Sequence, residues 1–323
     1  MPEIFNREQI ENSLRQVDVT TAIEDGLVAY SQGKVVVPPV GELVFEDPPG
    51  DVHIKYGYIK DDDYFVIKIA SGFYGKVDTG LPPYDGLMLV FSQKTARLEC
   101  ILLDECYLTN VRTAAAGAVV AKYLAPSVVE RIGVFGAGVQ GRMQVEALLP
   151  IVDCRDVIVW GTGEEELEAY REAMSEHGLS IQTTLTGDEI AATCNLIVTS
   201  TPSHEPLLSV EQIREGTHIT AMGADTREKN ELDPSILGKA DLVVADSIEQ
   251  CRVRGEIFHA LEAGVLREGD AVELGNVIVD PTLRRTDDSQ ITVADLTGVA
   301  VQDIQISKAV YEVLTGGARG SNT

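Results

Sequence analysis

Short apolar runs alternate with amphipathic helical segments through the middle of the chain, from about Arg131 to about Asp246. A parallel sheet with a helix after each strand produces this alternation. Segments with helical spacing, such as Glu164–His177 and Val210–Glu215, separate the runs. We therefore predict a doubly wound α/β domain with strands at Ile132–Phe135, Val157–Trp160, Leu196–Thr199, His218–Met222 and Leu242–Val244.

The first hundred residues have a different pattern, which indicates a second domain of α+β type. An amphipathic helix is expected in the Arg7–Gly33 region. Apolar and polar residues then alternate with a period of two, which is typical of strands with one buried face. We expect such strands at His53–Ile59, Phe65–Ala70 and Leu87–Phe91, and a last helix over Thr297–Leu314 that returns to this domain.

Three glycines at G-x-G-x-x-G spacing follow the first strand of the α/β domain. The first permits a tight turn, the second lets the backbone approach a pyrophosphate, and the third lets the next helix pack closely on its strand. Free N–H groups at that helix N-terminus attract phosphate. A glycine turn without a ligand is the alternative, but the flanking strand and helix favour a Rossmann-type dinucleotide site comprising Gly136, Ala137, Gly138, Val139, Gln140 and Gly141.

The segment Gly161–Glu166 follows the second strand, where an NAD site usually places an acidic residue and an NADP site an arginine. Gly161 and Thr162 are expected to contact the cofactor, with Thr162 or Glu164 as the partner of a ribose hydroxyl. The glutamates repel a 2′-phosphate, and no Lys or Arg is close in the sequence. We therefore expect NAD, as NADH in the reductive direction, rather than NADP.

The formal net charge of −25 makes nucleic acid and acidic lipid poor partners, because both are themselves anionic. An anionic substrate would also be repelled at long range, so a site for one must concentrate Lys and Arg locally. Solubility or adaptation to salt is the alternative explanation of the charge.

The five cysteines are scattered and form no C-x-x-C pair, which argues against a disulfide framework and a structural zinc site. The first residues lack the pattern of a signal peptide, and no apolar run reaches the length of a membrane span. We expect a cytoplasmic protein.

Several segments together resemble the ornithine cyclodeaminase/μ-crystallin family, which includes alanine dehydrogenases and ketimine or imine reductases. These are Leu108–Gly117, Ala121–Ala125, the glycine loop, Thr199–Pro202, Gly216–Asp225, Lys229–Asp233, Gly255–Ile257 and Asp295–Gly298. The resemblance implies a substrate and dimerisation domain (1–122, completed by 298–323), an NAD-binding domain (123–297) and a homodimer.

The resemblance also implies roles for three charged residues. Arg112 matches an arginine that grips the substrate α-carboxylate, which suits a planar guanidinium. Lys68 matches a strand lysine near the substrate, and Asp225 matches the carboxylate beside the reacting carbon. The alternatives are a surface ion pair for Arg112, an outward-facing lysine for Lys68 and a helix cap for Asp225.

Further positions match family residues that contact the cofactor, although an ordinary loop is a serious alternative for Thr201 and Pro202. They are Thr113, Thr199, Ser200, Thr201, Pro202, Met222, Gly223 and Thr297. Glu256 and His259 have a spacing seen in metal sites, but no further ligands accompany them, and we expect no metal.

One departure from the family concerns the substrate. Relatives that act on ornithine or alanine often have a basic residue after the Pro-Pro pair, where this chain has Val40. His53 and Lys55 stand instead at alternate positions of one strand, and therefore on one face. If they face the pocket, the site favours a dicarboxylate; a solvated lysine at position 55 is an equally open alternative.

The sequence favours an NAD(H)-dependent imine reductase or amino-acid dehydrogenase that reduces a small 2-imino acid, preferably iminosuccinate to L-aspartate. Ornithine cyclodeamination is the first alternative, with Glu42 as the candidate partner of a distal ammonium. Alanine dehydrogenase and a non-catalytic NAD(P)-binding protein are the others. The joint presence of Lys68, Arg112 and Asp225 argues against lost chemistry.

Overall fold

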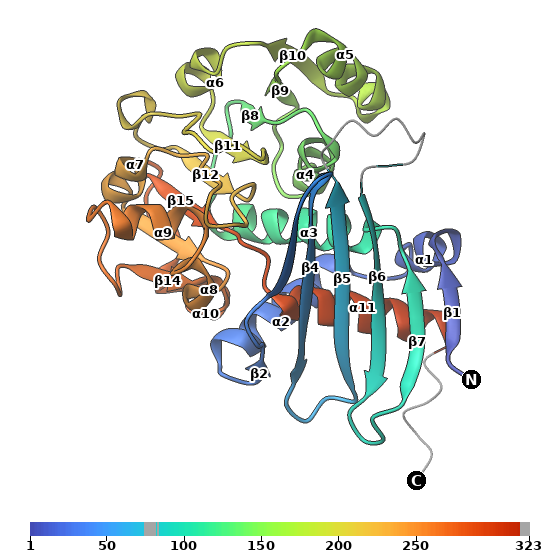
Figure 1. Cartoon of the computed structure of the whole chain (residues 1–323). Helices are drawn as coiled ribbons and strands as arrows, with labels where there is room; N and C mark the ends of the chain where they lie inside the picture. The colour runs from blue at the N-terminus through green and yellow to red at the C-terminus, as the bar shows by residue number, and fades with distance from the viewer. Residues whose placement is uncertain (74–81, 83, 317–323) are drawn as a thin grey trace. The chain divides into compact units, whose positions relative to one another are not determined.

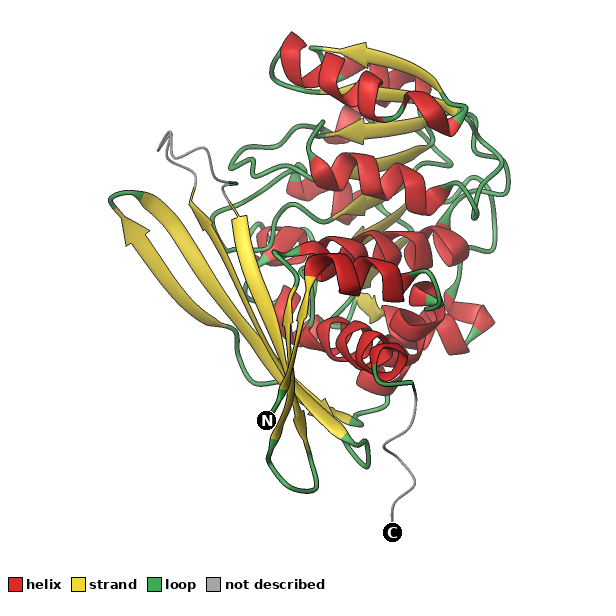
Figure 2. Cartoon of the chain, turned by 90° about the vertical axis from the view of Figure 1, so that its right-hand side faces the viewer, coloured by secondary structure: helices red, strands yellow, loops and turns green. Residues whose placement is uncertain are grey.

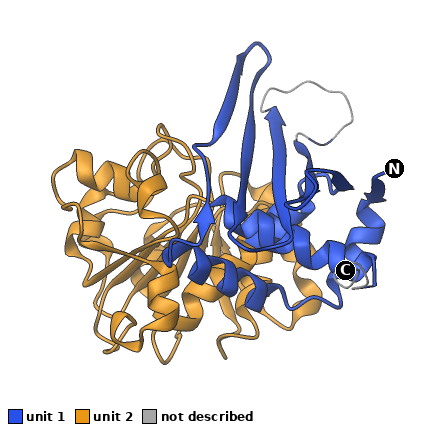
Figure 3. Ribbon diagram, turned by 90° about the horizontal axis from the view of Figure 1, so that it is seen from below, with its two compact units in different colours: residues 1–112, 299–323 blue, residues 113–298 orange. Residues whose placement is uncertain are grey.

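A computed structural model describes residues 1–73, 82 and 84–316. The chain divides into two compact units, which are coloured separately in Figure 3. Unit 1 consists of Met1–Arg112 with Val299–Thr323, and unit 2 consists of Thr113–Gly298. The division falls inside helix α3 (Tyr107–Leu124), so this helix supplies residues to both units.

Unit 2, which the structure describes throughout, contains an eight-stranded parallel sheet in the order β10-β9-β8-β11-β12-β15-β13-β14. All five strands predicted for this sheet are present within one residue at each end. The strands are β8 (Ile132–Phe135), β9 (Asp156–Trp160), β10 (Ser180–Thr184), β11 (Leu196–Thr199), β12 (His218–Ala221), β13 (Leu242–Ala245), β14 (Ala271–Glu273) and β15 (Thr292–Asp295). The strand order reverses between β8 and β11, and open α/β sheets bind ligands at such switch points, beyond the carboxyl ends of the strands.

Helices and 3-10 turns follow the strands of unit 2 (Figure 2). They are α4 (Val139–Leu148), α5 (Glu164–Ala173), η1 (Ser175–His177), α6 (Asp188–Thr193), η2 (Val210–Gln212), α7 (Pro234–Lys239), α8 (Ile248–Cys251), α9 (Gly255–Glu262), α10 (Leu274–Val279) and η3 (Pro281–Leu283). The helix predicted at Val210–Glu215 is wrong: a capping box between Ser209 and Gln212 closes a single 3-10 turn, and Ile213 is extended and buried in the core.

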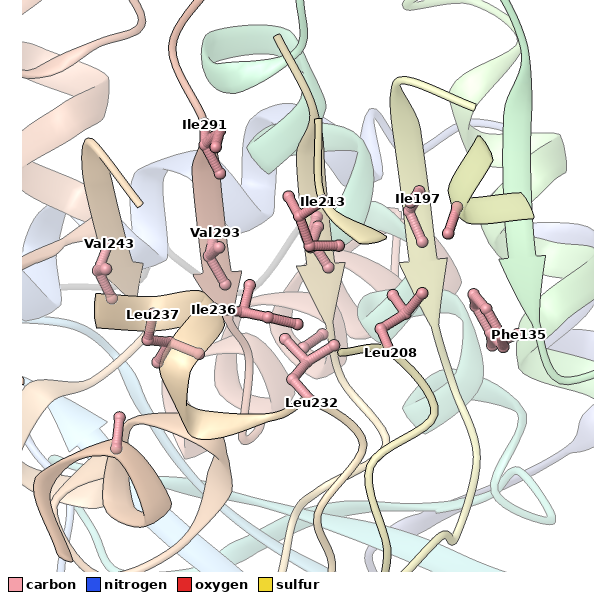
Figure 4. Packing of buried hydrophobic residues seen from close by; sticks show 14 of the residues in the cluster. Phe135, Ile197, Leu208, Ile213, Leu232, Ile236, Leu237, Val243, Ile291 and Val293 are labelled. Atoms are coloured by element: carbon pink, nitrogen blue, oxygen red, sulfur yellow. The ribbon is translucent and has the colours of Figure 1, made fainter. Parts of the chain in front are cut away.

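The core of unit 2 lies against the sheet, as Figure 4 shows for part of it. Strands β8, β11, β12 and β15 are buried at every residue, because both faces of this parallel sheet are covered. Ile197, Val243 and Val293 of the strands pack with Ile236 and Leu237 of α7. Continuous burial explains why β8 and β11 appear in the sequence as short, mostly apolar runs, whereas buried polar residues interrupt β12 and β15.

Among the described residues of unit 1, seven strands form one sheet in the order β1-β7-β6-β5-β4-β2, with β3 paired to β4. All neighbours are antiparallel except β1 and β7. The strands are β1 (Glu3–Asn6), β2 (Val35–Val36), β3 (Gly41–Glu46), β4 (Pro49–Ile59), β5 (Tyr64–Phe73), β6 (Tyr84–Ser92) and β7 (Leu98–Leu103).

Helix α11 (Ala300–Leu314) packs across the sheet of unit 1 and contacts β4, β5, β6 and α2 (Figure 1). The single helix expected in the Arg7–Gly33 region is two: α1 (Arg7–Leu14) and α2 (Val19–Ser31). Asp18 breaks the pattern because its carboxylate accepts a hydrogen bond from Thr21 N and caps a new helix. None of the helices in the described ranges has the length and apolar character needed to cross a membrane.

Candidate functional site

The glycine loop joins β8 to α4 in unit 2. Gly136 has a φ of 114°, which side-chain-bearing residues rarely adopt, and a Cβ on Gly141 would clash with the Gly136 carbonyl oxygen. A Cβ on Gly138 would meet no atom of the described residues within 4 Å. Gly138 also begins α4 without a side-chain cap, and the positive end of a helix attracts an anion. The loop therefore fits the pyrophosphate of a dinucleotide.

Other residues of this loop differ in exposure. Ala137 is buried, whereas Val139 is exposed and Gln140 is half-buried. The Gln140 amide oxygen accepts a hydrogen bond of 3.4 Å from Gln144 Nε2, which also donates to the Thr113 carbonyl oxygen at 3.1 Å. Thr113 is thus tied to the loop through one buried glutamine.

Glu166 holds the turn after β9. Its Oε1 accepts hydrogen bonds from Thr162 N, from Thr162 Oγ1 at 3.1 Å and from Gly163 N at 3.2 Å. The sequence suggested Thr162 or Glu164 as a ribose partner, and the structure places the Thr162 hydroxyl on a different glutamate. The first turn of α5 consists of three glutamates, Glu164, Glu165 and Glu166, a set of charges that disfavours a 2′-phosphate.

Glu231 joins the carboxyl ends of β11 and β12. This fully buried carboxylate accepts hydrogen bonds from Thr199 Oγ1 (2.7 Å), Thr201 N (2.6 Å), Thr201 Oγ1 (2.7 Å) and Gly223 N (2.8 Å). Burial raises the pKa of Glu231, and these hydrogen bonds oppose the increase. Thr199 and Thr201, two residues expected to contact the cofactor, therefore direct their hydroxyl protons to Glu231.

The neighbouring turn residues are placed by backbone contacts. Ser200 Oγ donates to the Phe135 carbonyl oxygen at 3.3 Å, while Pro202 is exposed. Met222 is buried directly after β12, and Gly223 follows it. Ser200, Met222 and Gly223 thus line the carboxyl ends of the strands beside the switch point.

A second group of carboxylates lies at the carboxyl ends of β13 and β15. Asp295, at the end of β15, accepts a hydrogen bond from Ile257 N at 2.8 Å, and burial raises its pKa to about 7. Asp246 accepts hydrogen bonds from Gly298 N at 2.7 Å and from Thr297 Oγ1 at 3.1 Å. The Thr297 hydroxyl also accepts a hydrogen bond from Gln250 Nε2 at 2.8 Å, so it acts as both a donor and an acceptor within unit 2.

Asp225 lies in the loop after β12, four residues beyond the strand end. Its carboxylate pairs with Lys229 Nζ at 2.6 Å, and about a third of its side chain is exposed (35%). The alternative of a helix cap does not hold, since α7 begins at Pro234 with Asp233 as its cap. Asp225 is a surface-accessible carboxylate with a cation beside it.

Unit 1 places three buried cations on or beside one face of its sheet. Lys55 of β4 lies directly opposite Lys68 of β5, and their exposures are 5% and 3%. The alternative of a solvated Lys55 is therefore wrong. His53 has the same facing as Lys55, is half-buried and pairs with Ala70.

Arg112, which is 5% exposed, meets two consecutive residues of α11. Its Nη1 donates a hydrogen bond to Gln302 Oε1 at 2.8 Å, and its Nε lies 3.2 Å from Asp303 Oδ1. Asp303 Oδ2 lies 4.0 Å from Lys68 Nζ, so one carboxylate stands between the arginine and the lysine. Asp104 is also buried; burial raises its pKa to about 6 although the charge of Lys68 opposes the increase.

The predicted substrate residues thus lie in unit 1, and the predicted cofactor residues lie in unit 2 at several strand ends. The sequence analysis missed Gln302, Asp303 and Glu231. A signal was present for two of them: Asp303 is an acid among apolar residues near the start of a helix, and Glu231 lies in one of the family-like segments.

Comparison with known proteins matches residues 2–318 to the model of the Ornithine cyclodeaminase/mu-crystallin family. An uncharacterized cyclodeaminase of Sinorhizobium fredii is 39% identical over 94% of both chains. Iminosuccinate reductase of Paracoccus denitrificans is 38% identical over 78% of both chains. An archaeal alanine dehydrogenase dimer with bound NAD superimposes with a TM-score of 0.89 at 33% identity, covering 99% of this chain and 98% of that one.

Proposed function

Because this chain belongs to the ornithine cyclodeaminase/mu-crystallin family, we propose that it is an NAD(H)-dependent imine reductase, equivalently an amino-acid dehydrogenase working in the reductive direction. The proposed reaction converts a small 2-imino acid to an L-amino acid, with iminosuccinate and L-aspartate as the preferred pair. Relatives of nearly equal identity carry the names of a cyclodeaminase and an iminosuccinate reductase, so the choice of substrate depends on the site.

The observation that carries this choice is the buried cation cluster of unit 1. In a chain with a net charge of −25, Lys55, Lys68 and Arg112 are almost fully buried together. Buried charges are costly unless they are paired. Asp303 lies between Lys68 and Arg112, and the concentrated positive charge of the cluster would attract a substrate with two carboxylates. The cluster therefore suits a dicarboxylate better than an amine-bearing chain.

Arg112 would bind the α-carboxylate, since a guanidinium holds a carboxylate with two parallel hydrogen bonds. Lys55, with His53 beside it, would bind the distal carboxylate. Lys68 and Asp225 would hold or relay the iminium proton. Bound NADH supplies the hydride for the imine carbon, and in unit 2 the glycine loop and the strand-end turns would hold it.

The three alternatives differ in what they require of these residues. Ornithine cyclodeamination needs an acid for a distal ammonium, and Glu42 of β3 is exposed opposite His53. Alanine dehydrogenase needs Arg112 but gives Lys55 no ligand. A non-catalytic NAD(P)-binding protein needs neither Lys68 nor Asp225.

The test is a panel of substrates followed by NADH absorbance: oxaloacetate and pyruvate with ammonia or methylamine, preformed cyclic imines, and ornithine with NAD. We expect NADH oxidation with the imine of oxaloacetate and weaker activity with NADPH. Ornithine turnover without net NADH change would favour the cyclodeaminase. Inactivity on the whole panel with retained NADH binding would favour the non-catalytic protein.

The proposed assembly is a homodimer, which is also the state named for the archaeal alanine dehydrogenase. Leu43, Val44 and Phe45 of β3 are exposed, and this apolar surface in unit 1 suits contact with a second copy. Light scattering after size-exclusion chromatography tests it: a monomer at micromolar concentration would refute the proposal.

A further inference from the structure

Asp303 is a buried carboxylate with unusual contacts. It is 1% exposed, yet neither of its oxygens accepts a hydrogen bond from the described residues. Its contacts are the two ionic ones, 3.2 Å to Arg112 Nε and 4.0 Å to Lys68 Nζ. Buried carboxylates usually accept several hydrogen bonds. Asp303 accepts none from the described residues, so its evident role is to interact with these two cations.

The contacts of Asp303 and Gln302 constrain the orientation of Arg112. A guanidinium has five N–H donors in one plane. Two consecutive residues of α11 contact two nitrogens of the Arg112 guanidinium. Gln302 Oε1 accepts a hydrogen bond from Nη1, and the Asp303 carboxylate lies beside Nε. Two contacts from one rigid helix fix both the plane and the rotation of the group, and the remaining donors then point in a defined direction.

We propose that Asp303 is a positioning residue that holds the Arg112 guanidinium in the orientation in which it receives the substrate α-carboxylate, with the Lys68 ammonium beside it. This inference rests on the proposed function, because it assumes that Arg112 binds that carboxylate. Asp303 itself does not touch the substrate; it acts through the two cations.

Charge alone predicts the opposite effect of removing Asp303. Substitution with Asn would leave the three cations with one negative charge fewer, and simple attraction would then strengthen binding of an anion. Positioning predicts weaker binding, since a guanidinium that rotates freely must lose that freedom when the substrate binds. The sign of the change therefore separates the two explanations.

The experiment compares Asp303→Asn with Asp303→Glu and with Ser307→Ala, a control at an equally buried position of α11. We expect Asp303→Asn to raise KM for the imines of oxaloacetate and pyruvate alike by about tenfold or more, since both carry the α-carboxylate. The NADH affinity of Asp303→Asn should change less than about twofold. In Ser307→Ala, KM should likewise change less than about twofold. Restoration of the charge in Asp303→Glu should recover part of the lost affinity.

A second variant covers the case in which Asp303→Asn does not fold. Gln302→Met removes the other contact to Arg112 and should also raise KM without changing NADH affinity. An unchanged or lower KM in the folded variants, or an equal rise in Ser307→Ala, would overturn the positioning role.

The activity of the unmodified enzyme on the two imines tests the proposed function separately. If it reduces neither imine, the positioning role is judged by the increase in unfolding temperature that saturating succinate produces in the presence of NAD. The increase should shrink in Asp303→Asn and persist in Ser307→Ala. Absence of any succinate effect in the unmodified protein would overturn the positioning role as well.

Discussion

The two units bury charge in opposite ways. In unit 1, Lys55, Lys68 and Arg112 are buried on or beside the sheet and Asp303 stands between two of them. In unit 2, the carboxylates of Glu231, Glu256, Asp246 and Asp295 are buried and receive their hydrogen bonds from N–H and hydroxyl groups.

We relate this difference to the proposed function: the cations of unit 1 would bind the substrate, and the buried carboxylates of unit 2 would support the loops around them. Burial raises the pKa values of Glu231, Glu256 and Asp295. These carboxylates accept hydrogen bonds from the loops around them and hold those loops in place. We expect the phosphates of a cofactor to bind at the glycine loop, because α4 begins there without a side-chain cap.

The largest effect should come from Asp225, which differs from the four buried acids in being accessible and paired with Lys229. Asp225→Asn keeps the size and removes the charge. If this carboxylate handles the iminium proton, kcat should fall by roughly 100- to 10,000-fold with little change in NADH affinity. A variant that keeps most of its turnover would place Asp225 with the scaffold.

Arg112→Ala should have the next largest effect, on kcat/KM for the imine. Loss of one partner of a desolvated charge pair costs roughly 2–5 kcal/mol, and each 1.4 kcal/mol is about tenfold. Titration with NADH should show unchanged binding, because the glycine loop and its supporting residues belong to unit 2. Arg97→Ala, at an exposed position of the same unit, is the control, and normal kinetics in Arg112→Ala would remove the arginine from the site.

Asp295 tests the scaffold through pH. Its pKa is raised by burial from 3.8 to about 7, so the folded state keeps a proton that the unfolded state loses above pH 4. Its contribution to stability is therefore complete below pH 4 and is lost as the pH rises through 7. The shift corresponds to at most about 4 kcal/mol.

Asp295→Asn removes this titration. The stability of the variant relative to the unmodified protein should accordingly improve between pH 4 and pH 8, as measured by urea unfolding at several pH values. Parallel pH profiles for the two proteins would show that Asp295 is ionised in the folded state, and the contrast between the units would weaken.

The smallest of these effects is expected for Glu231→Gln, which tests whether a scaffold carboxylate serves the cofactor. Gln cannot accept from all of the donors that Glu231 satisfies, so one buried donor is left unpaired at a cost of about 1–3 kcal/mol. We expect NADH binding to weaken roughly 5- to 150-fold as the two turns lose their common anchor. A change in stability without a change in NADH affinity would give Glu231 a purely structural role.

The sequence predicted five of the eight strands of the parallel sheet, because strands that are covered on both faces, such as β8 and β11, appear as short apolar runs. It predicted unit 1 less well. Strand alternation shows that His53 and Lys55 share a face, but the burial of that face depends on tertiary packing. Lys55 could therefore not be distinguished from a solvated lysine.

The contacts that hold the candidate site residues in place also could not be predicted from the sequence, because they join residues that are far apart in the chain. Arg112 and Gln302 are 190 positions apart, and Thr199 and Glu231 are 32 apart. A single sequence shows that an acid lies in an apolar helix or next to a turn, but only the fold identifies the partner. Glu231 and Asp303 were accordingly found from the structure alone.

The central claim, that the cations of unit 1 select a dicarboxylic imino acid, is tested most directly by one ratio: kcat/KM for iminosuccinate divided by kcat/KM for the imine of pyruvate, with NADH. We expect a ratio well above one in the unmodified enzyme. In Lys55→Met it should fall towards one through a higher KM for the dicarboxylate alone, whereas the exposed control Lys94→Met should leave it unchanged. A ratio below one in the unmodified enzyme would contradict the claim and make alanine dehydrogenase the better assignment.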